Sequence, residues 1–217
     1  MSETYIVYGA SGSGSVPIEA ALALLQLPYR VEDHAPWESP ERASALAGIN
    51  PMLQVPALVL PSGEVMTESA AILIWLADAY PQARLAPIAA EVTRPAYLRW
   101  MTFVSSAIYA LYWISDDPSR VIGRTEDHAA GKALLFDRIA HCWGVMDAQV
   151  RPGRYILGDD LSVLDLYVTT ASRWSPGRQR FSEVAPRLAE VARRVDAEPR
   201  LATLWAERYP FVQGWEQ

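Results

Sequence analysis

The sequence predicts a chain of two parts, an α/β domain followed by an all-helical domain. Over 1–80, short apolar runs with β-branched and aromatic residues alternate with segments of helical period. Residues 81–92 then carry two prolines and no sustained period, which is typical of a domain boundary. Over 93–217 the periodic segments are all helical. We therefore expect two domains, at 1–80 and 93–217, with a linker at 81–92.

The chain begins with a β-α-β unit. Residues 4–8 are β-branched and aromatic, which favours a strand, and a glycine-serine loop follows at 9–15. Pro17 suits a first helical turn, Pro28 ends the helix, and 29–32 forms a second strand. Such a unit implies parallel pairing with a right-handed crossover. The loop glycines do not fit a dinucleotide-binding fingerprint, because Pro17 stands where the third glycine belongs.

A short helix, a hairpin and a longer helix complete the first domain. We expect the short helix at 39–47, a strand at 57–60 and, after a Pro-Ser-Gly-Glu turn, a return strand that begins at Val65. The helix at 69–78 places three aliphatic side chains on one face. A β-α-β unit followed by α-β-β-α is the thioredoxin-like order. The fold class predicted for this domain is therefore α/β, thioredoxin-like.

The second domain is predicted to contain several helices. Aromatic residues are concentrated in the first, at 93–115. A second, at 126–149, carries Cys142 within an apolar pattern, which predicts that this thiol is buried. A third begins at Ser162, because Asp165 three residues further on completes a capping box. Cys142 is the only cysteine, so an intramolecular disulfide is excluded.

Composition and charge exclude several classes of function. The net charge is −6 and no basic run occurs, which argues against nucleic acid or an anionic membrane as a partner. No apolar stretch approaches the roughly 20 residues that span a bilayer, and 4–8 is too short for the apolar core of a signal peptide. We therefore expect a cytoplasmic protein. The three histidines stand far apart and lack acidic partners at ligand spacing, so no metal site is expected.

Polar residues mark the point where the return strand meets the helix at 69–78. A helix start offers unpaired backbone N–H groups and a partial positive charge, so Ser69 and its neighbours can hold a carboxylate. Glu68 beside it can hold an ammonium group. Together they suit the α-amino-acid end of a ligand. The alternative is that Ser69 only caps the helix and that Glu68 only compensates its dipole.

A longer motif surrounds this point. The chain contains N-P-x-x-x-V-P-x-L and, after a glycine turn, E-S-x-A-I-x-x-W-L. This order resembles the glutathione-binding segment of the glutathione transferase family. The resemblance implies a cis peptide before Pro56 and pairing of the Val55 backbone with the cysteinyl part of glutathione. It also implies that Glu68 and Ser69 bind the γ-glutamyl end, with Gln54 near the glycyl end.

A second match lies in the helical domain, where 158–165 reads G-x-x-x-S-x-L-D, with Leu164 at a position where this family commonly has alanine. The two matches extend the resemblance to nearly the whole chain. They imply the glutathione transferase architecture, a homodimer and a role in detoxification. Glutathione is then the co-substrate, and its thiolate attacks a small apolar electrophile. The alternatives are a glutathione-dependent isomerase, dehalogenase or disulfide reductase, or a non-catalytic binding protein of the same fold.

Such chemistry needs a hydrogen-bond donor for the sulfur, because a thiol of this kind has a pKa of about 8.5. Family members supply the donor from the loop after the first strand. The positions where they carry serine or cysteine are Gly12 and Gly14 here, which have no side chain. Ser11, Ser13 and Ser15 remain. Ser13 lies mid-loop between the glycines and is the first candidate, with the loop's backbone N–H groups as the alternative.

The electrophile is expected to contact the helical domain. Tyr109, Tyr112 and Trp113 give its first helix a broad aromatic face, which suits an apolar or aromatic substrate. The same side chains also suit packing inside a helix bundle. The sequence does not specify the substrate.

Overall fold

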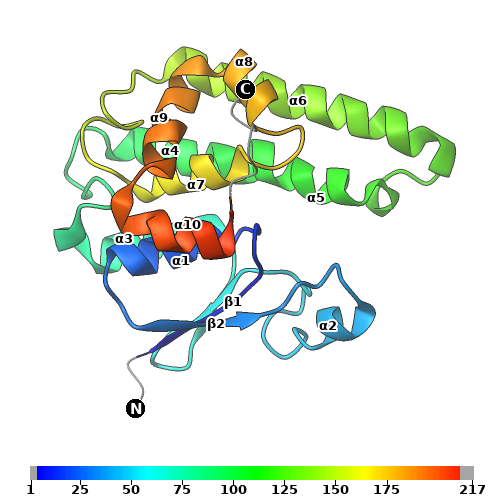
Figure 1. Cartoon of the computed structure of the whole chain (residues 1–217), viewed down its shortest axis with the longest axis horizontal. Coiled ribbons are helices and arrows are strands. Elements are labelled where there is room, and N and C mark those ends of the chain that lie inside the picture. Colours follow the sequence, from blue (N-terminus) through cyan, green and yellow to red (C-terminus); the bar gives the residue numbers. More distant parts are fainter. Residues whose placement is uncertain (1–3, 211–217) are drawn as a thin grey trace. The chain divides into compact units, whose positions relative to one another are not determined.

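The computed structural model describes residues 4–210, and the contacts among them define two compact units (Figure 1). The first unit contains 4–88 and 196–210, and the second contains 89–195. The first is a mixed sheet with helices and the second is built from helices, so the predicted fold class is confirmed. No helix among the described residues is both long and apolar enough to span a membrane.

The sheet of the first unit has four strands in the order β2-β1-β3-β4. The strands are β1 (Tyr5–Gly9), β2 (Tyr29–Asp33), β3 (Ala57–Val59) and β4 (Val65–Met66). β1 runs parallel to β2 and antiparallel to β3, and β3 pairs with β4 as an antiparallel hairpin. The parallel pair is the one joined through a helix, as the geometry of a β-α-β unit requires.

Two helices pack against each other in this unit and form its core together with the sheet (Figure 1). They are α1 (Val16–Leu24) and α3 (Ser69–Ala79), and a short helix, α2 (Pro40–Ser44), follows β2. Leu22 of α1 and Leu73 of α3 have no exposed surface. Burial of apolar surface contributes about 25 cal/mol per Å², so this contact is a main source of the unit's stability.

Three connecting segments leave the sheet at the same end, and this positions the candidate site. In the antiparallel pairs, Tyr8 lies opposite Ala57, and Leu58 lies opposite Met66. The end of β1, the start of β3 and the end of β4 therefore coincide. The loop at 10–15, the residues that precede β3 and the residues that join β4 to α3 meet there, although they are distant in sequence.

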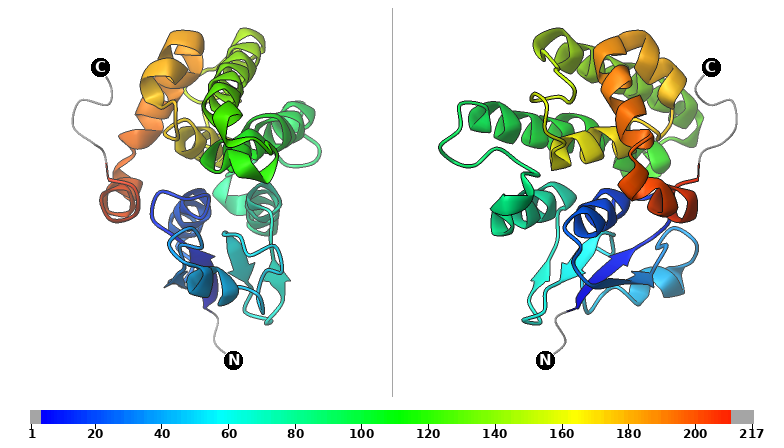
Figure 2. Two further views of the ribbon diagram at one scale, coloured as in Figure 1. Left: turned by 90° about the vertical axis from the view of Figure 1, so that its right-hand side faces the viewer. Right: turned by 60° about the vertical axis from the view of Figure 1, so that its left-hand side comes forward.

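The last described segment belongs to the first unit. A 3-10 turn, η5 (Pro199–Leu201), and helix α10 (Ala202–Arg208) contact α1 (Figure 2). Their buried side chains, Leu201, Leu204 and Trp205, follow helical spacing. This differs from the boundary expected from the sequence, which placed the whole C-terminal part in the helical domain. The spacing of apolar residues in a short helix indicates which face is buried, but it does not indicate which domain covers that face.

The second unit is a set of helices, one of which is buried over its whole length. They are α4 (Arg94–Phe103), the π-helical turn η2 (Val104–Tyr109), α5 (Ala110–Asp116), α6 (His128–Gln149), α7 (Val163–Ala171), α8 (Arg178–Val184) and α9 (Pro186–Asp196). Short 3-10 turns stand at η3 (Pro118–Arg120) and η4 (Thr125–Asp127), and η1 (Pro81–Ala83) follows α3 in the first unit. Every residue of α7 is buried. The single helix predicted at 93–115 is thus interrupted by η2.

The buried helix α7 begins with the predicted capping box, which is confirmed. The Asp165 carboxylate accepts from the N–H of Ser162 at 2.8 Å, from the Ser162 hydroxyl at 2.7 Å and from the N–H of Ile156 at 2.8 Å. Burial raises the pKa of Asp165 to about 6, although these hydrogen bonds act to lower it. Asp165 therefore ties the preceding loop to the start of α7, which is a structural role.

Candidate functional site

The loop that precedes β3 is built around Asn50, which is buried. Its amide nitrogen donates to the Gln54 carbonyl oxygen at 2.8 Å, and its Oδ1 accepts from the Met52 N–H at 3.0 Å. The Val55–Pro56 peptide is cis, as predicted. Among the described residues, no hydrogen bond engages the Val55 main chain. An extended peptide can pair with main-chain groups of this kind.

Glu68, the residue before α3, has a backbone conformation that side chains rarely adopt. Its φ is 66° and its ψ is 102°. A conformation of this kind costs a non-glycine residue about 1–3 kcal/mol, and such strain is concentrated at ligand sites and switch regions. Glu68 is exposed, whereas Ser69, the first residue of α3, is buried. The first N–H groups of α3 have no acceptors within the helix, so they are suited to an anion.

The loop at 10–15 is held together by two of its three serines. Ser13 Oγ accepts from the N–H of Ala10 at 3.3 Å and of Ser15 at 3.2 Å, and it lies 3.1 Å from Ser15 Oγ. Ser15 Oγ donates to Glu19 Oε1 at 2.8 Å. A hydroxyl has one hydrogen and a carboxylate only accepts, so the hydrogen between the two serines comes from Ser13. Both side chains are buried, and their hydroxyls are engaged within the loop.

Ser11, the third serine, is exposed and has a different partner. Its Oγ accepts from Arg208 Nη1 at 3.1 Å. Gly12 beside it has a φ of 71°, a left-handed conformation that favours glycine. The Gly12 N–H donates to the Arg208 carbonyl oxygen at 2.8 Å. The backbone of this loop thus accounts for glycine at the position where the family commonly has serine.

Arg208 reaches this loop from α10 and also binds the carboxylate beneath it. Its Nε donates to Glu19 Oε2 at 2.7 Å and its Nη2 donates to Oε1 at 3.2 Å. The Glu19 side chain is only 1% exposed and that of Arg208 16%. Our sequence analysis missed both residues. The one local signal was Glu19 itself, an acidic residue inside the otherwise apolar helix α1.

The three aromatic residues predicted for the electrophile pocket do not act alike. Tyr109 stacks on Tyr167 with ring centroids 5.8 Å apart and meets Trp174 edge-on at 4.9 Å. Tyr112 also meets Trp174 edge-on, at 5.1 Å. Trp113 stands outside this cluster, because it is 40% exposed and its ring lies 4.6 Å from the Arg120 guanidinium. The second unit therefore joins Tyr109 and Tyr112 around Trp174 and leaves Trp113 apart.

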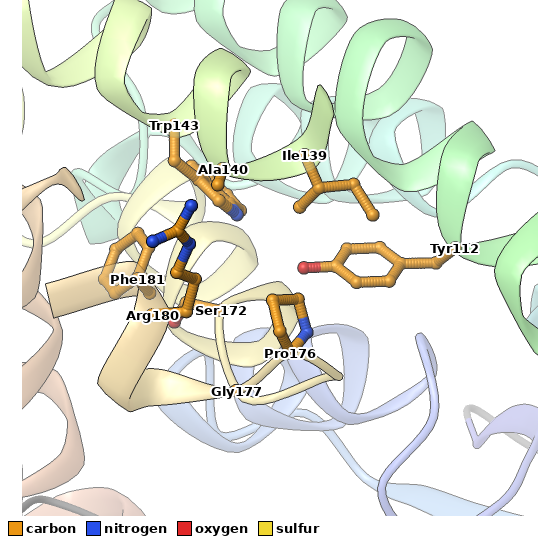
Figure 3. A pocket seen from close by; sticks show the side chains of 9 residues that line it. All are labelled: Tyr112, Ile139, Ala140, Trp143, Ser172, Pro176, Gly177, Arg180 and Phe181. Carbon is orange, nitrogen blue, oxygen red and sulfur yellow. The ribbon is translucent and has the colours of Figure 1, made fainter. Parts of the chain in front are cut away.

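A small pocket opens beside Tyr112 in the second unit (Figure 3). The Tyr112 ring enters it from α5 and faces Arg180 and Phe181 of α8 across the space. The space in it that a water molecule can occupy measures only about 10 Å³, and the pocket is lined by Tyr112, Ile139, Ala140, Trp143, Ser172, Pro176, Gly177, Arg180 and Phe181. Pockets for organic ligands usually measure about 300–1,000 Å³, so this one is too small to serve as an electrophile site by itself.

The cysteine and the histidines have structural surroundings. Cys142 is buried, as predicted, and burial raises the pKa of its thiol. The His34 ring stacks on Tyr8 with centroids 5.5 Å apart, and His128 Nε2 lies 2.8 Å from the Ile122 carbonyl oxygen. Within 4–210, no group of three His, Cys, Asp or Glu side chains is placed to hold a metal ion.

Comparisons with known proteins agree with this architecture. Residues 15–79 match the family described as glutathione S-transferase, N-terminal domain. An uncharacterized GST-like protein of Escherichia coli K12, YncG, is 29% identical over 197 residues, which cover 90% of this chain and 94% of that protein. A probable maleylacetoacetate isomerase of Caenorhabditis elegans is 28% identical over 169 residues, which cover 76% and 74%. A crystal structure of a glutathione transferase homolog from Sulfitobacter, with bound glutathione, has a TM-score of 0.83 and 23% identity, and covers 94% of this chain and 97% of that one.

A thioredoxin-like unit with a cis-proline loop, followed by a helical unit, is the architecture of the glutathione transferases. The matching domain family, the similar curated proteins and the shared fold point the same way. This chain is therefore similar to the bacterial-type glutathione transferases over nearly its whole length, and its residues 15–79 match the N-terminal domain of that family. The resemblance inferred from the two sequence motifs is therefore confirmed.

Proposed function

We propose that this protein is an enzyme that binds glutathione at the end of the sheet and activates its thiol as a thiolate, which forms a carbon–sulfur bond with an electrophile as the electrophile's leaving group departs or its double bond or ring opens. The observation that carries the proposal is that three segments meet there. Among residues 4–210 no hydrogen bond engages the Val55 main chain, and Glu68 is strained at the start of α3. Pro56 in its cis form presents Val55 to the cysteinyl part. Glu68 holds the α-ammonium group, Ser69 and the first N–H groups of α3 hold the carboxylate, and Gln54 lies near the glycyl end.

The sulfur is proposed to receive its hydrogen bond from Ser11 rather than from Ser13. The Ser13 hydrogen is engaged with Ser15, and the Ser15 hydrogen is engaged with Glu19. Ser11 is exposed, and Arg208 already donates to its oxygen, so its own hydrogen is left for an outside acceptor. A donor of this kind stabilises the thiolate and lowers the thiol pKa. Ser13 and Ser15 then shape the loop that presents Ser11.

The second substrate is proposed to be a small apolar electrophile recognised by aromatic residues of the second unit. The cluster of Tyr109 and Tyr112 around Trp174 supports an aromatic or otherwise flat group. Trp113 has its ring against Arg120 and takes no part in that cluster. We further propose a cytoplasmic homodimer, as for the family, which light scattering at micromolar concentration tests directly.

A second candidate function is glutathione-dependent isomerisation, which the probable maleylacetoacetate isomerase among the relatives favours. Isomerisation also needs the thiolate but leaves no glutathione conjugate. A non-catalytic binding protein is the third candidate, because Gly12 and Gly14 replace the usual side-chain donors. The three candidates differ in whether the electrophile is conjugated, rearranged or unchanged.

The experiment that tests the proposal has two stages. The protein is first passed over immobilised glutathione and eluted with the free ligand. It is then incubated with glutathione and a panel of aryl halides, epoxides, unsaturated ketones, isomerisable dienes and disulfides. We expect retention on the column and a glutathione conjugate from at least one apolar electrophile. Lack of retention, together with no heat of binding at millimolar glutathione, would overturn the proposal.

A further inference from the structure

A buried ion pair joins the C-terminal helix to the loop proposed to activate the thiol. Glu19 of α1 is buried and accepts three hydrogen bonds, two from Arg208 and one from Ser15. Placing a carboxylate in such a position requires a cation and hydrogen bonds around it. Asp33 at 3.9 Å and the Tyr29 phenol are the other titratable groups that face Arg208. Asp33 is largely exposed, so Glu19 is the dominant partner.

Arg208 does more than neutralise Glu19, because it contacts the loop at two further points. Its Nη1 donates to Ser11 Oγ at 3.1 Å, and its carbonyl oxygen accepts from the Gly12 N–H at 2.8 Å. A guanidinium presents its donors in a planar, rigid fork. Fixing two of them on Glu19 therefore fixes the direction of the one that reaches Ser11.

The hydrogen bond from Arg208 Nη1 also polarises the Ser11 hydroxyl. A hydrogen bond from a cation polarises the oxygen that accepts it and strengthens the hydrogen bond that the same hydroxyl donates. With Arg208 on its oxygen, Ser11 is left with one hydrogen and no acceptor for it among the described residues. A thiolate offers the missing acceptor.

We propose that Arg208 is a positioning residue for thiol activation, which anchors on Glu19 and aims the Ser11 hydroxyl at the glutathione sulfur. This inference rests on the proposed function. Under this proposal, a residue of α10 orients a serine of the loop at 10–15, which lies 197 positions earlier in the chain. Arg208 itself touches neither the sulfur nor the electrophile in this scheme.

The test measures the pKa of the bound glutathione thiol through the ultraviolet absorbance of the thiolate in the intact protein. We expect Arg208→Gln to raise that pKa by about 1, while the dissociation constant of glutathione changes less than threefold. Arg200→Gln is the matched control, because Arg200 lies in the same segment but has a largely exposed side chain that pairs with Glu198, two positions away. That control should titrate like the parent.

Three further variants separate the positioning role of Arg208 from its contribution to general stability. Arg208→Lys keeps the positive charge beside Glu19 but cannot serve Glu19 and Ser11 together. It should therefore melt close to the parent and still show the raised thiol pKa, and it replaces Arg208→Gln if that variant does not fold. Ser11→Ala should raise the thiol pKa by a similar amount, and the double variant Ser11→Ala with Arg208→Lys should raise it no further.

The outcomes distinguish this inference from the proposed function. A parent that does not bind glutathione, or whose bound thiol titrates like free glutathione, refutes the proposed function. A parent with a lowered thiol pKa that Arg208→Lys and Arg208→Gln leave unchanged refutes only the positioning role. Additive effects of Ser11→Ala and Arg208→Lys show that Arg208 does not act through Ser11, which also overturns the inference.

Discussion

The two segments proposed to form the glutathione site are held in place by different means. The segment at 50–69 is organised by its sequence neighbours, because Asn50 bonds residues two and four positions on and Glu68 begins the helix next to it. The loop at 10–15 is organised from a distance, through Glu19 and Arg208. Under the proposed function, ligand binding would be encoded locally, whereas thiol activation would depend on a tertiary contact. Mutation should be able to separate the two.

The largest expected effect is a loss of stability when the ion pair between Glu19 and Arg208 is broken. Arg208→Met leaves the Glu19 carboxylate buried without a cation. Removing one partner of a buried ion pair costs about 3–5 kcal/mol, and we expect the lower end because the Arg208 side chain is 16% exposed. Urea unfolding followed by tryptophan fluorescence measures the loss. The local segment offers no equivalent single change.

A paired substitution provides the control for that prediction. Removing both charges, as Glu19→Leu with Arg208→Met, leaves no unpaired carboxylate, so the double variant should be more stable than Arg208→Met alone. Arg200→Met should stay within about 0.5 kcal/mol of the parent, because the Arg200 side chain is 60% exposed. A double variant less stable than Arg208→Met would contradict the account of this pair.

The serines of the loop should separate into structural and exposed roles. Ser13→Ala leaves the Ser15 N–H without its acceptor and the Ala10 N–H with Ser15 Oγ alone, which should cost about 1–3 kcal/mol. Ser11→Ala removes an exposed hydroxyl and should change stability by less than about 0.5 kcal/mol. Thermal unfolding of the two variants tests this contrast. Equal losses of stability in the two variants would contradict the assignment of a structural role to Ser13 and not to Ser11.

A smaller effect is expected where the local segment is strained. Glu68→Gly and Glu68→Ala both remove the carboxylate, so they should weaken glutathione binding equally. Glycine accepts a φ of 66° without the penalty that alanine bears there. Glu68→Gly should therefore be about 1 kcal/mol more stable than Glu68→Ala, as measured by the urea midpoint. A reversed order would show that Glu68 is not strained in solution.

Sequence patterns predicted the local segment well because the determinants of its structure are neighbours. The short strands β3 and β4, the turn between them and the start of α3 follow from apolar runs and turn residues. The cis peptide before Pro56 followed from the motif. Arg208 gave no comparable signal. It lies in a short helix whose packing partner only the fold reveals, so the sequence did not indicate that Arg208 pairs with Glu19 or contacts Ser11.

In the helical unit, too, the sequence pattern did not predict one feature of the backbone. Periodicity predicted one helix at 93–115, but η2 inserts a π-helical turn. A π turn adds one residue and rotates every later side chain about the helix axis. Beyond η2, Tyr112 is buried, whereas its neighbour Trp113 is 40% exposed and lies beside Arg120. Local backbone irregularities of this type leave no mark in the pattern of apolar residues.

The most direct test of the account is the affinity of glutathione for the parent and for Glu68→Ala, measured by titration calorimetry at neutral pH. Hydrogen bonds to charged groups contribute about 1.5–3 kcal/mol, so we expect Glu68→Ala to bind roughly tenfold or more weakly. Glu64→Ala, in the exposed turn of the same hairpin, is the matched control and should bind like the parent. Undiminished binding by Glu68→Ala would contradict the proposed placement of the γ-glutamyl end and with it the site.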